Sequence, residues 1–106
     1  MKFITLIPTK RNDGSAVSSQ EMLEILESLW SRFGGLQSEG PINGHWIDSQ
    51  DGRHFRDECL RVTVACDNER LQEAQDAVVE IGKRLNQRAM YFDIQDFDGV
   101  RVLRIV

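Results

Sequence analysis

Two amphipathic helical stretches, each flanked by strand-like segments, limit the folds open to this chain of 106 residues. The first stretch begins after Ser18, which precedes Glu21 at the spacing of a capping box, and it ends before Gly34-Gly35. Its apolar residues recur at helical intervals on one face: Met22, Leu26, Leu29 and Phe33. These signals predict a helix with a well-marked start and stop.

The second stretch follows Asp67, which we predict to be its N-cap. A narrow apolar stripe runs along this stretch: Leu71, Ala74, Val78, Ile81 and Leu85. Basic residues gather where it ends, as the helix dipole favours: Lys83, Arg84 and Arg88. A second amphipathic helix is therefore expected.

Strand patterns occupy the first and middle segments of the chain. Residues 2–7 are predicted to form a strand that is stopped by Pro8. Residues 42–48 and 53–65 are predicted to form a hairpin around Asp51-Gly52, a favoured two-residue turn sequence. The second of these strands alternates in the manner of a half-buried strand, with Leu60, Val62 and Val64 on one side.

A final hairpin is predicted from residues 90–95 and 100–106 around Asp98-Gly99. The element order is then β-α-β-β-α-β with one added C-terminal strand. This order is typical of an α+β, ferredoxin-like fold, with an antiparallel sheet and two helices on one face. At this length we expect residues 1–106 to form a single domain.

The charge balance disfavours two classes of partner. The formal net charge is −4 and the isoelectric point is about 5.1, which argues against binding to nucleic acid or to anionic membrane surfaces. The apolar start at residues 1–8 is too short for a signal peptide, and no run approaches the length of a membrane span. A cytoplasmic protein is expected.

The two cysteines, Cys59 and Cys66, are predicted to be free thiols. Seven residues apart on one strand, they would lie about 20 Å from each other and point to opposite faces. Free thiols suit a reducing compartment. Their spacing is not that of metal ligands, and we expect neither a metal nor a cofactor.

The densest group of unusual residues lies in the hairpin over 44–57, which contains both histidines and one of the two tryptophans. If Asp51-Gly52 is a strict two-residue turn, Trp46 pairs with Asp57. On the same count Asp48 pairs with Phe55, and His45 with Glu58. Trp46 and Phe55 would then share the sheet face that no helix covers, whereas a one-residue slip would reverse the faces.

The last hairpin adds Tyr91, Val100 and Val102 to that open face and pairs Asp93 with Arg104. So many apolar side chains are not expected to stay in water. A second subunit, a ligand or a partner protein should cover them. The expected interface or binding residues are Trp46, Asp48, Arg53, Phe55, Asp57 and Tyr91.

The hairpin also carries a resemblance. Its pattern of Gly-x-Trp-x-Asp, a turn, and Gly-x-x-aromatic-x-Asp is similar to that of small uncharacterised bacterial ferredoxin-like proteins, a family of domains of unknown function. The matching residues are Gly44, Trp46, Asp48, Gly52, Phe55 and Asp57. The preceding Phe33-Gly34-Gly35-Leu36 is similar too. The resemblance implies the fold and supplies no activity.

Four residues are weak candidates for acid–base chemistry: Asp48, Asp57, His45 and His54. The simpler interpretation makes His45 a surface partner of Glu58 and leaves His54 exposed near the turn. It also gives the two aspartates turn hydrogen bonds or pairing with Arg53 or Arg61. The simpler interpretation is favoured.

The favoured function is that of a homo-oligomeric interaction or binding module that uses the open face and the 44–57 hairpin. The alternative is a small-molecule enzyme, similar to the isomerases and oxygenases among ferredoxin-like dimers, in which Arg53 or Arg56 orients an anionic substrate. An RNA-binding module is disfavoured, because Arg61, Thr63 and Ala65 stand where stacking rings are needed.

Overall fold

The computed structural model describes residues 1–96 and Leu103. Strands and helices follow one another as β1 (Lys2–Pro8), α1 (Ser19–Phe33), β2 (Gln37–Ile47), β3 (His54–Ala65), α2 (Leu71–Arg84) and β4 (Phe92–Gln95). A short 3-10 turn, Asn68–Arg70, precedes α2. The predicted strand over 100–106, with Val100, Val102 and the Asp93–Arg104 pair, lies outside the described residues.

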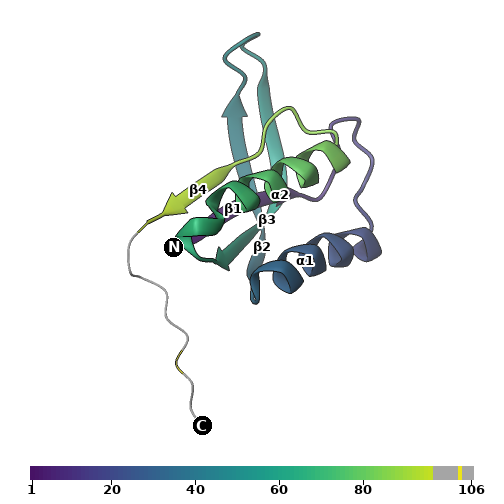
Figure 1. Ribbon diagram of the computed structural model, residues 1–106. Helices are drawn as coiled ribbons and strands as arrows, with labels where there is room; N and C mark the ends of the chain where they lie inside the picture. The colour runs from purple at the N-terminus through teal and green to yellow at the C-terminus, as the bar shows by residue number, and fades with distance from the viewer. Residues whose placement is uncertain (97–102, 104–106) are drawn as a thin grey trace.

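The four strands form one sheet in the order β2-β3-β1-β4, and every neighbouring pair is antiparallel. Both helices lie in front of this sheet in Figure 1, on the same side. The chain is thus an α+β protein whose four-stranded antiparallel sheet and two helices are compatible with the ferredoxin-like arrangement. No helix in residues 1–96 is long and apolar enough to cross a membrane.

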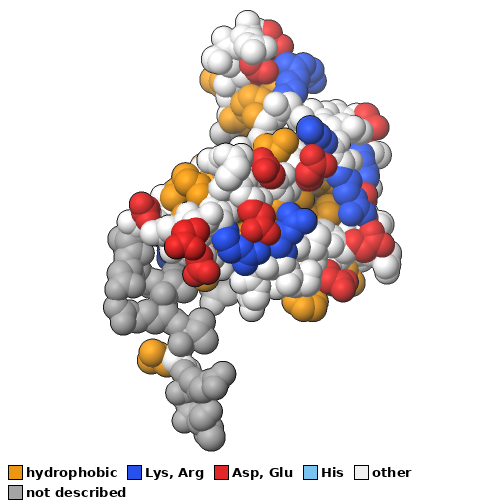
Figure 2. Space-filling view, viewed as in Figure 1, with side chains coloured by type: hydrophobic (Ala, Val, Ile, Leu, Met, Phe, Trp, Pro, Cys, Tyr) orange, Lys and Arg blue, Asp and Glu red, His pale blue; other side chains and the backbone are white. Residues whose placement is uncertain are grey.

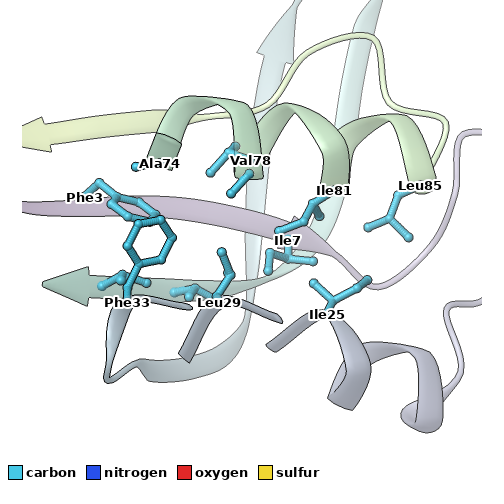
Figure 3. Close-up of a cluster of buried hydrophobic side chains, with 12 residues drawn as sticks. Phe3, Ile7, Ile25, Leu29, Phe33, Ala74, Val78, Ile81 and Leu85 are labelled. Atoms are coloured by element: carbon cyan, nitrogen blue, oxygen red, sulfur yellow. The ribbon is translucent and has the colours of Figure 1, made fainter. Parts of the chain in front are cut away.

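The core fills the space between the sheet and the two helices. Phe3 stands at its centre, opposite Val64 in the β1–β3 register, and is fully buried. Its ring stacks on Phe92 at 5.1 Å and meets Phe33 edge-on at 5.6 Å. Figure 3 shows how the helices complete this cluster with Ile25, Leu29, Phe33, Ala74, Val78, Ile81 and Leu85. Most residues of the predicted helical stripes therefore face the core, although Met22, Leu26 and Leu71 are only partly buried. The fully buried Ile25 of α1 was not predicted.

Both signals predicted for the first helix are confirmed. The Ser18 hydroxyl accepts a hydrogen bond from the Glu21 N–H at 3.0 Å. Gly34 takes the left-handed conformation (φ +94°) and its N–H donates to the Trp30 carbonyl. The Glu21 side chain pairs with Arg11 and with Arg84. Ser18 thus caps α1, and Glu21 ties the helix to the β1–α1 loop and to α2.

The start of the second helix differs from the prediction. Asp67 precedes the 3-10 turn, yet its side chain makes no capping hydrogen bond. The first residues after it coil more tightly, and α2 proper begins only at Leu71. Arg70 is held there by Glu73, with its Nε 2.8 Å from Oε2. An ion pair thus supports the turn in place of the predicted cap.

The β2 strand, at one edge of the sheet, is interrupted at Gly40-Pro41. The pairing with β3 shifts register between Glu39 and Ile42. Gly40 has a φ of +139°, and a Cβ there would lie 2.9 Å from the Cys59 carbonyl oxygen. The bulge therefore requires glycine at this position.

Charged side chains of both signs intermix over the outer surface of the helices (Figure 2). Among them, hydrogen bonds from Arg11 and then from Arg84 hold the pKa of Glu21 below its ordinary value of 4.5. A carboxyl whose pKa is lower in the folded state stabilises the fold above its unfolded pKa, and this contribution is lost as pH falls through the folded value.

Glu21→Gln is therefore expected to lower the melting temperature at pH 7, whereas the difference from wild type should shrink below about pH 4. Thermal unfolding followed by circular dichroism at the two pH values checks this. Glu27→Gln, at an exposed position of the same helix, is the control. A deficit of Glu21→Gln that stays constant from pH 7 to pH 3 would contradict the linkage.

Candidate functional site

The β2–β3 hairpin projects from the rest of the molecule as an arm (Figure 1), and its tip is a six-residue loop over 48–53. The Asp48 N–H donates to the Arg53 carbonyl at 2.9 Å. Inside the loop, the Asp48 carboxylate accepts from the Gln50 N–H and the Asp51 carboxylate from the Arg53 N–H, each at 2.9 Å. The predicted two-residue turn at Asp51-Gly52 is wrong, because these aspartate side chains build a wider turn.

The wider loop moves the register of the arm by two residues. Trp46 pairs with Phe55, where Asp57 was predicted, and Gly44 takes the place opposite Asp57. An even shift keeps each side chain on its face, since strand side chains alternate. Trp46, Phe55 and Asp57 therefore share the helix-free face as predicted, while Asp48 leaves the strand and joins the loop.

Arg88, from the α2–β4 loop, contacts both the aromatic pair on that face and the loop at the tip of the arm. The rings of Trp46 and Phe55 stack with centroids 4.7 Å apart. The Arg88 guanidinium lies 5.0 Å from the Phe55 centroid. Arg88 Nη1 also donates to Asp51 Oδ2 at 2.8 Å and to Asp48 Oδ2 at 3.2 Å. Arg88 thus fixes the α2–β4 loop to the tip of the arm.

The hydrogen bonds from Arg88 define the role of the two loop aspartates, Asp48 and Asp51. The hydrogen bond from Arg88 holds the pKa of Asp51 below its usual range, with a further contribution from the Arg53 N–H. Asp48 binds the same guanidinium and the Gln50 N–H. Asp48, predicted as a weak acid–base candidate, therefore serves as a hydrogen-bond acceptor that shapes the loop.

A cleft of about 250 Å³ lies between the helix-free face, the arm and the α2–β4 loop. Gly44 forms part of its floor: a Cβ there would be 3.8 Å from the Leu6 side chain and 4.0 Å from the Asp57 carbonyl oxygen. The residues that border the cleft are mostly apolar: Leu6, Pro8, Gly44, His45, Trp46, Asp57, Cys59, Gln87, Ala89, Met90 and Tyr91. Asp57 is the one carboxylate among these residues.

A hydrogen bond and a packing contact hold the loop side of the cleft. The Thr5 hydroxyl donates to the Tyr91 carbonyl at 2.7 Å. Met90 lies against Gly82 of α2, so close that a Cβ on Gly82 would be 2.6 Å from Met90 Cγ. The absence of a side chain at Gly82 thus allows the loop to lie over the helix end and turn toward the arm.

Cys59 reaches the cleft as a thiol and not as a thiolate. Burial, and to a lesser extent the charges of Asp57 and Glu58, raises its pKa to about 11. Both cysteines are free, as predicted. A nucleophilic role for Cys59 is therefore disfavoured.

Cys59 is expected to alkylate slowly. A pKa two units above normal leaves about a hundredfold less thiolate at pH 8, which the greater intrinsic nucleophilicity offsets to about tenfold. Burial should slow the reaction further. The measurement is iodoacetamide labelling followed by mass spectrometry, with the less buried Cys66 as the internal reference. Equal labelling of Cys59 and Cys66 would show that the cleft is open to reagent.

Comparison with solved structures finds a protein of similar fold. The chain is similar to a phage SAM lyase in complex with S-methyl-5′-thioadenosine, with a TM-score of 0.65 over 89% of this chain and 78% of the other. The sequence identity is 10%, so the likeness concerns the fold. No family model and no curated protein matches this chain.

The structure places some of the predicted site residues at the cleft and others elsewhere on the arm. Trp46, Asp57, Tyr91 and His45 border the cleft. The Phe55 ring stacks on Trp46, and the Arg53 guanidinium lies 4.7 Å from the Phe55 ring centroid. His45 pairs with Arg56 in register and contacts His54, so the predicted His45–Glu58 pair is wrong.

Sequence reasoning missed three residues of the site. Gly44 could have been recognised from the sequence, because a glycine inside a strand often marks a place where a ligand or another backbone approaches closely. Arg88 was assigned to the helix end, and Met90 to an ordinary strand. The role of Arg88 depends on hydrogen bonds to Asp51 and Asp48, which are 37 and 40 residues away in the chain, and local patterns do not carry such contacts.

Proposed function

We propose that this chain is a small-molecule-binding protein and that its ligand occupies the cleft between the helix-free face and the α2–β4 loop. The observation that carries the proposal is the cleft itself: an apolar space beside an aromatic ring, with a single carboxylate, Asp57, at its border. This combination of apolar walls and a few polar groups is typical of ligand sites. The resemblance to the uncharacterised bacterial family stays a prediction.

The chemistry of the walls narrows the ligand class. Trp46 offers a flat apolar surface, and Asp57 offers an acceptor for a cation or for N–H and O–H donors. A planar ring that carries a donor or a positive group fits both. The cleft is small for a drug-sized ligand, so a compact ligand, or one part of a larger one, is expected. The bound S-methyl-5′-thioadenosine of the structural neighbour supports nucleosides as the first compounds to test.

Tryptophan fluorescence tests the proposal directly. The chain has two tryptophans, so a Trp30→Phe background leaves Trp46 as the only reporter. We expect saturable changes in emission with at least one of S-methyl-5′-thioadenosine, SAM, other purine nucleosides and aromatic amines. If no compound of this set changes the emission at millimolar concentration, the proposal fails.

Gly44→Val supplies the matched variant for that titration. The backbone of Gly44 does not require glycine, and the added Cβ meets only ordinary contacts. The valine methyl groups should fill the floor and abolish binding while the protein stays folded. Gly35→Val makes the same change at an exposed position with open space around it and should leave binding unchanged.

Self-association through the same face is the second candidate function. Tyr91 is 53% exposed beside the cleft, and Trp46 and Phe55 are only partly buried. The other half of the face is polar, with the Arg61–Glu39 ion pair at 3.5 Å, so a contact between two copies would centre on the arm. This supports, in part, the predicted homo-oligomeric module.

Light scattering coupled to size exclusion tests self-association. A dimer is expected at tens of micromolar, and Tyr91→Glu should convert it to a monomer by placing a charge in the contact. Leu23→Glu, on an outer position of α1 that is 63% exposed, is the control. A monomeric wild type over this concentration range excludes the second candidate and leaves the ligand proposal intact.

The predicted alternative of an enzyme rests on Asp57. It is the carboxylate of the cleft, and the protonated thiol of Cys59 offers no nucleophile beside it. If a bound compound is turned over, Asp57→Asn should retain binding and lose turnover. Turnover that survives in Asp57→Asn would rule out this residue as the acid–base group.

A further inference from the structure

The two histidines of the chain meet on the arm. His45 Nδ1 and His54 Nε2 are 3.0 Å apart, and the rings are nearly parallel, with 14° between their planes. The β2–β3 register places the two residues on the face opposite to Trp46 and Phe55. The strict two-residue turn predicted from the sequence would have placed Glu58 opposite His45 and kept the two histidines apart.

We propose that His45 and His54 form a two-nitrogen binding site for a divalent transition metal ion of the Zn²⁺, Ni²⁺ and Cu²⁺ group. Imidazole nitrogen is a ligand that suits these ions. Two nitrogens at about 2.0–2.1 Å from one ion lie about 2.9 Å apart at a right angle and about 3.3 Å apart at the tetrahedral angle. The observed 3.0 Å falls in this range, so the two facing nitrogens already lie at the spacing of two ligands of one ion.

Metal binding requires a small rearrangement of the two rings. In the hydrogen-bonded pair one facing nitrogen carries the hydrogen and the other accepts it. With a metal ion bound, both facing nitrogens present lone pairs, and the hydrogens are on His45 Nε2 and His54 Nδ1. Each ring also turns so that the lone pairs converge on one point. Both side chains are exposed, so solvent leaves room for this turn.

The surroundings determine the strength and kind of the site. In residues 1–96 and 103 no third histidine, cysteine or acid completes a metal cluster, so water fills the other coordination positions. Arg56, opposite His45 in the register, is a nearby positive charge that opposes the ion. The site is therefore an exchangeable one that links β2 to β3. Its occupancy should stiffen the arm that carries Trp46.

Isothermal titration of the full chain with Zn²⁺ and with Ni²⁺ tests the site. One ion per chain is expected, and His45→Asn or His54→Asn should weaken the affinity roughly a hundredfold, because the second ligand no longer acts at high effective concentration. Arg56→Gln should tighten binding a few-fold, since it removes a nearby positive charge. Equal affinity in wild type and in both single variants overturns the proposal.

The same titration includes a control for metal binding by the cysteine thiols. His45→Asn/His54→Asn together retain Cys59 and Cys66, so any binding that persists in this variant belongs to sulfur or to the chain terminus. Electron paramagnetic resonance of bound Cu²⁺ gives a second readout: two nitrogen donors are expected in wild type and one in each single variant. A one-nitrogen spectrum in wild type overturns the proposal even where an ion binds. His54 does not border the cleft, so His54→Asn should weaken metal binding and leave the Trp46 ligand titration unchanged, which separates this site from the cleft.

Discussion

Phe3→Ala is expected to lower the free energy of unfolding by about 3–5 kcal/mol, the range for phenylalanine truncation in a packed core. Phe3 is fully buried on the central strand β1. Its ring contacts Phe33 of α1 and Phe92 of β4, so one truncation removes contacts among three elements. A loss of this size is a large share of the stability of a domain of this length.

Urea unfolding followed by circular dichroism measures the effect. Phe3→Leu, which keeps much of the volume, should cost less than the alanine variant. Leu23→Ala on the exposed side of α1 should change stability by no more than about 0.5 kcal/mol. A loss below about 1 kcal/mol in Phe3→Ala would mean that the core does not converge on this ring.

Gly82→Val is expected to cost about 1–3 kcal/mol, as overpacking of a close contact does, and to weaken any ligand of the cleft. The valine Cβ would lie 2.6 Å from Met90 Cγ, so the Met90 side chain must move. Met90 borders the cleft, and its displacement carries the α2–β4 loop away from the arm.

A double-mutant cycle with Met90→Ala separates this steric effect from others. Met90→Ala should itself destabilise, because it removes a partly buried side chain. In the double variant the added valine occupies the vacated space, so the combined loss should be smaller than the sum of the two. The readouts are urea unfolding and the Trp46 titration. Strict additivity would show that Gly82 is not where the loop is held.

The two ends of α1 could be predicted from the sequence because each depends on a few neighbouring residues. Ser18 caps the N–H of Glu21, three residues away, and Gly34 supplies the left-handed stop. The helical stripes and the order of the strands depend on periodicity, which the sequence displays directly. The overall α+β architecture could be predicted for the same reason.

The site depended on information that the sequence does not carry locally. Asp51-Gly52 predicts a tight turn, but the side chains of Asp48 and Asp51 cap other N–H groups and widen it. That two-residue change brings His45 to His54 and Gly44 to Asp57. The Arg88–Asp48 hydrogen bond joins residues 40 positions apart in the chain. The register error was two residues, an even number, so each side chain stayed on its predicted face of the sheet. The faces were therefore predicted correctly, while the cross-strand partners were not.

The interruption of β2 at Gly40-Pro41 also bears on how this protein avoids unwanted assembly. An edge strand exposes unpaired N–H and C=O groups that can template another chain. On β2 the proline lacks an N–H, and the register shift between Glu39 and Ile42 breaks the edge into two short segments. A continuous intermolecular strand pairing along β2 is thereby blocked. Copies of this chain that do associate should meet through side chains of the sheet face, in a contact that dilution can reverse, and not through an extended backbone ladder of the kind that seeds fibrils.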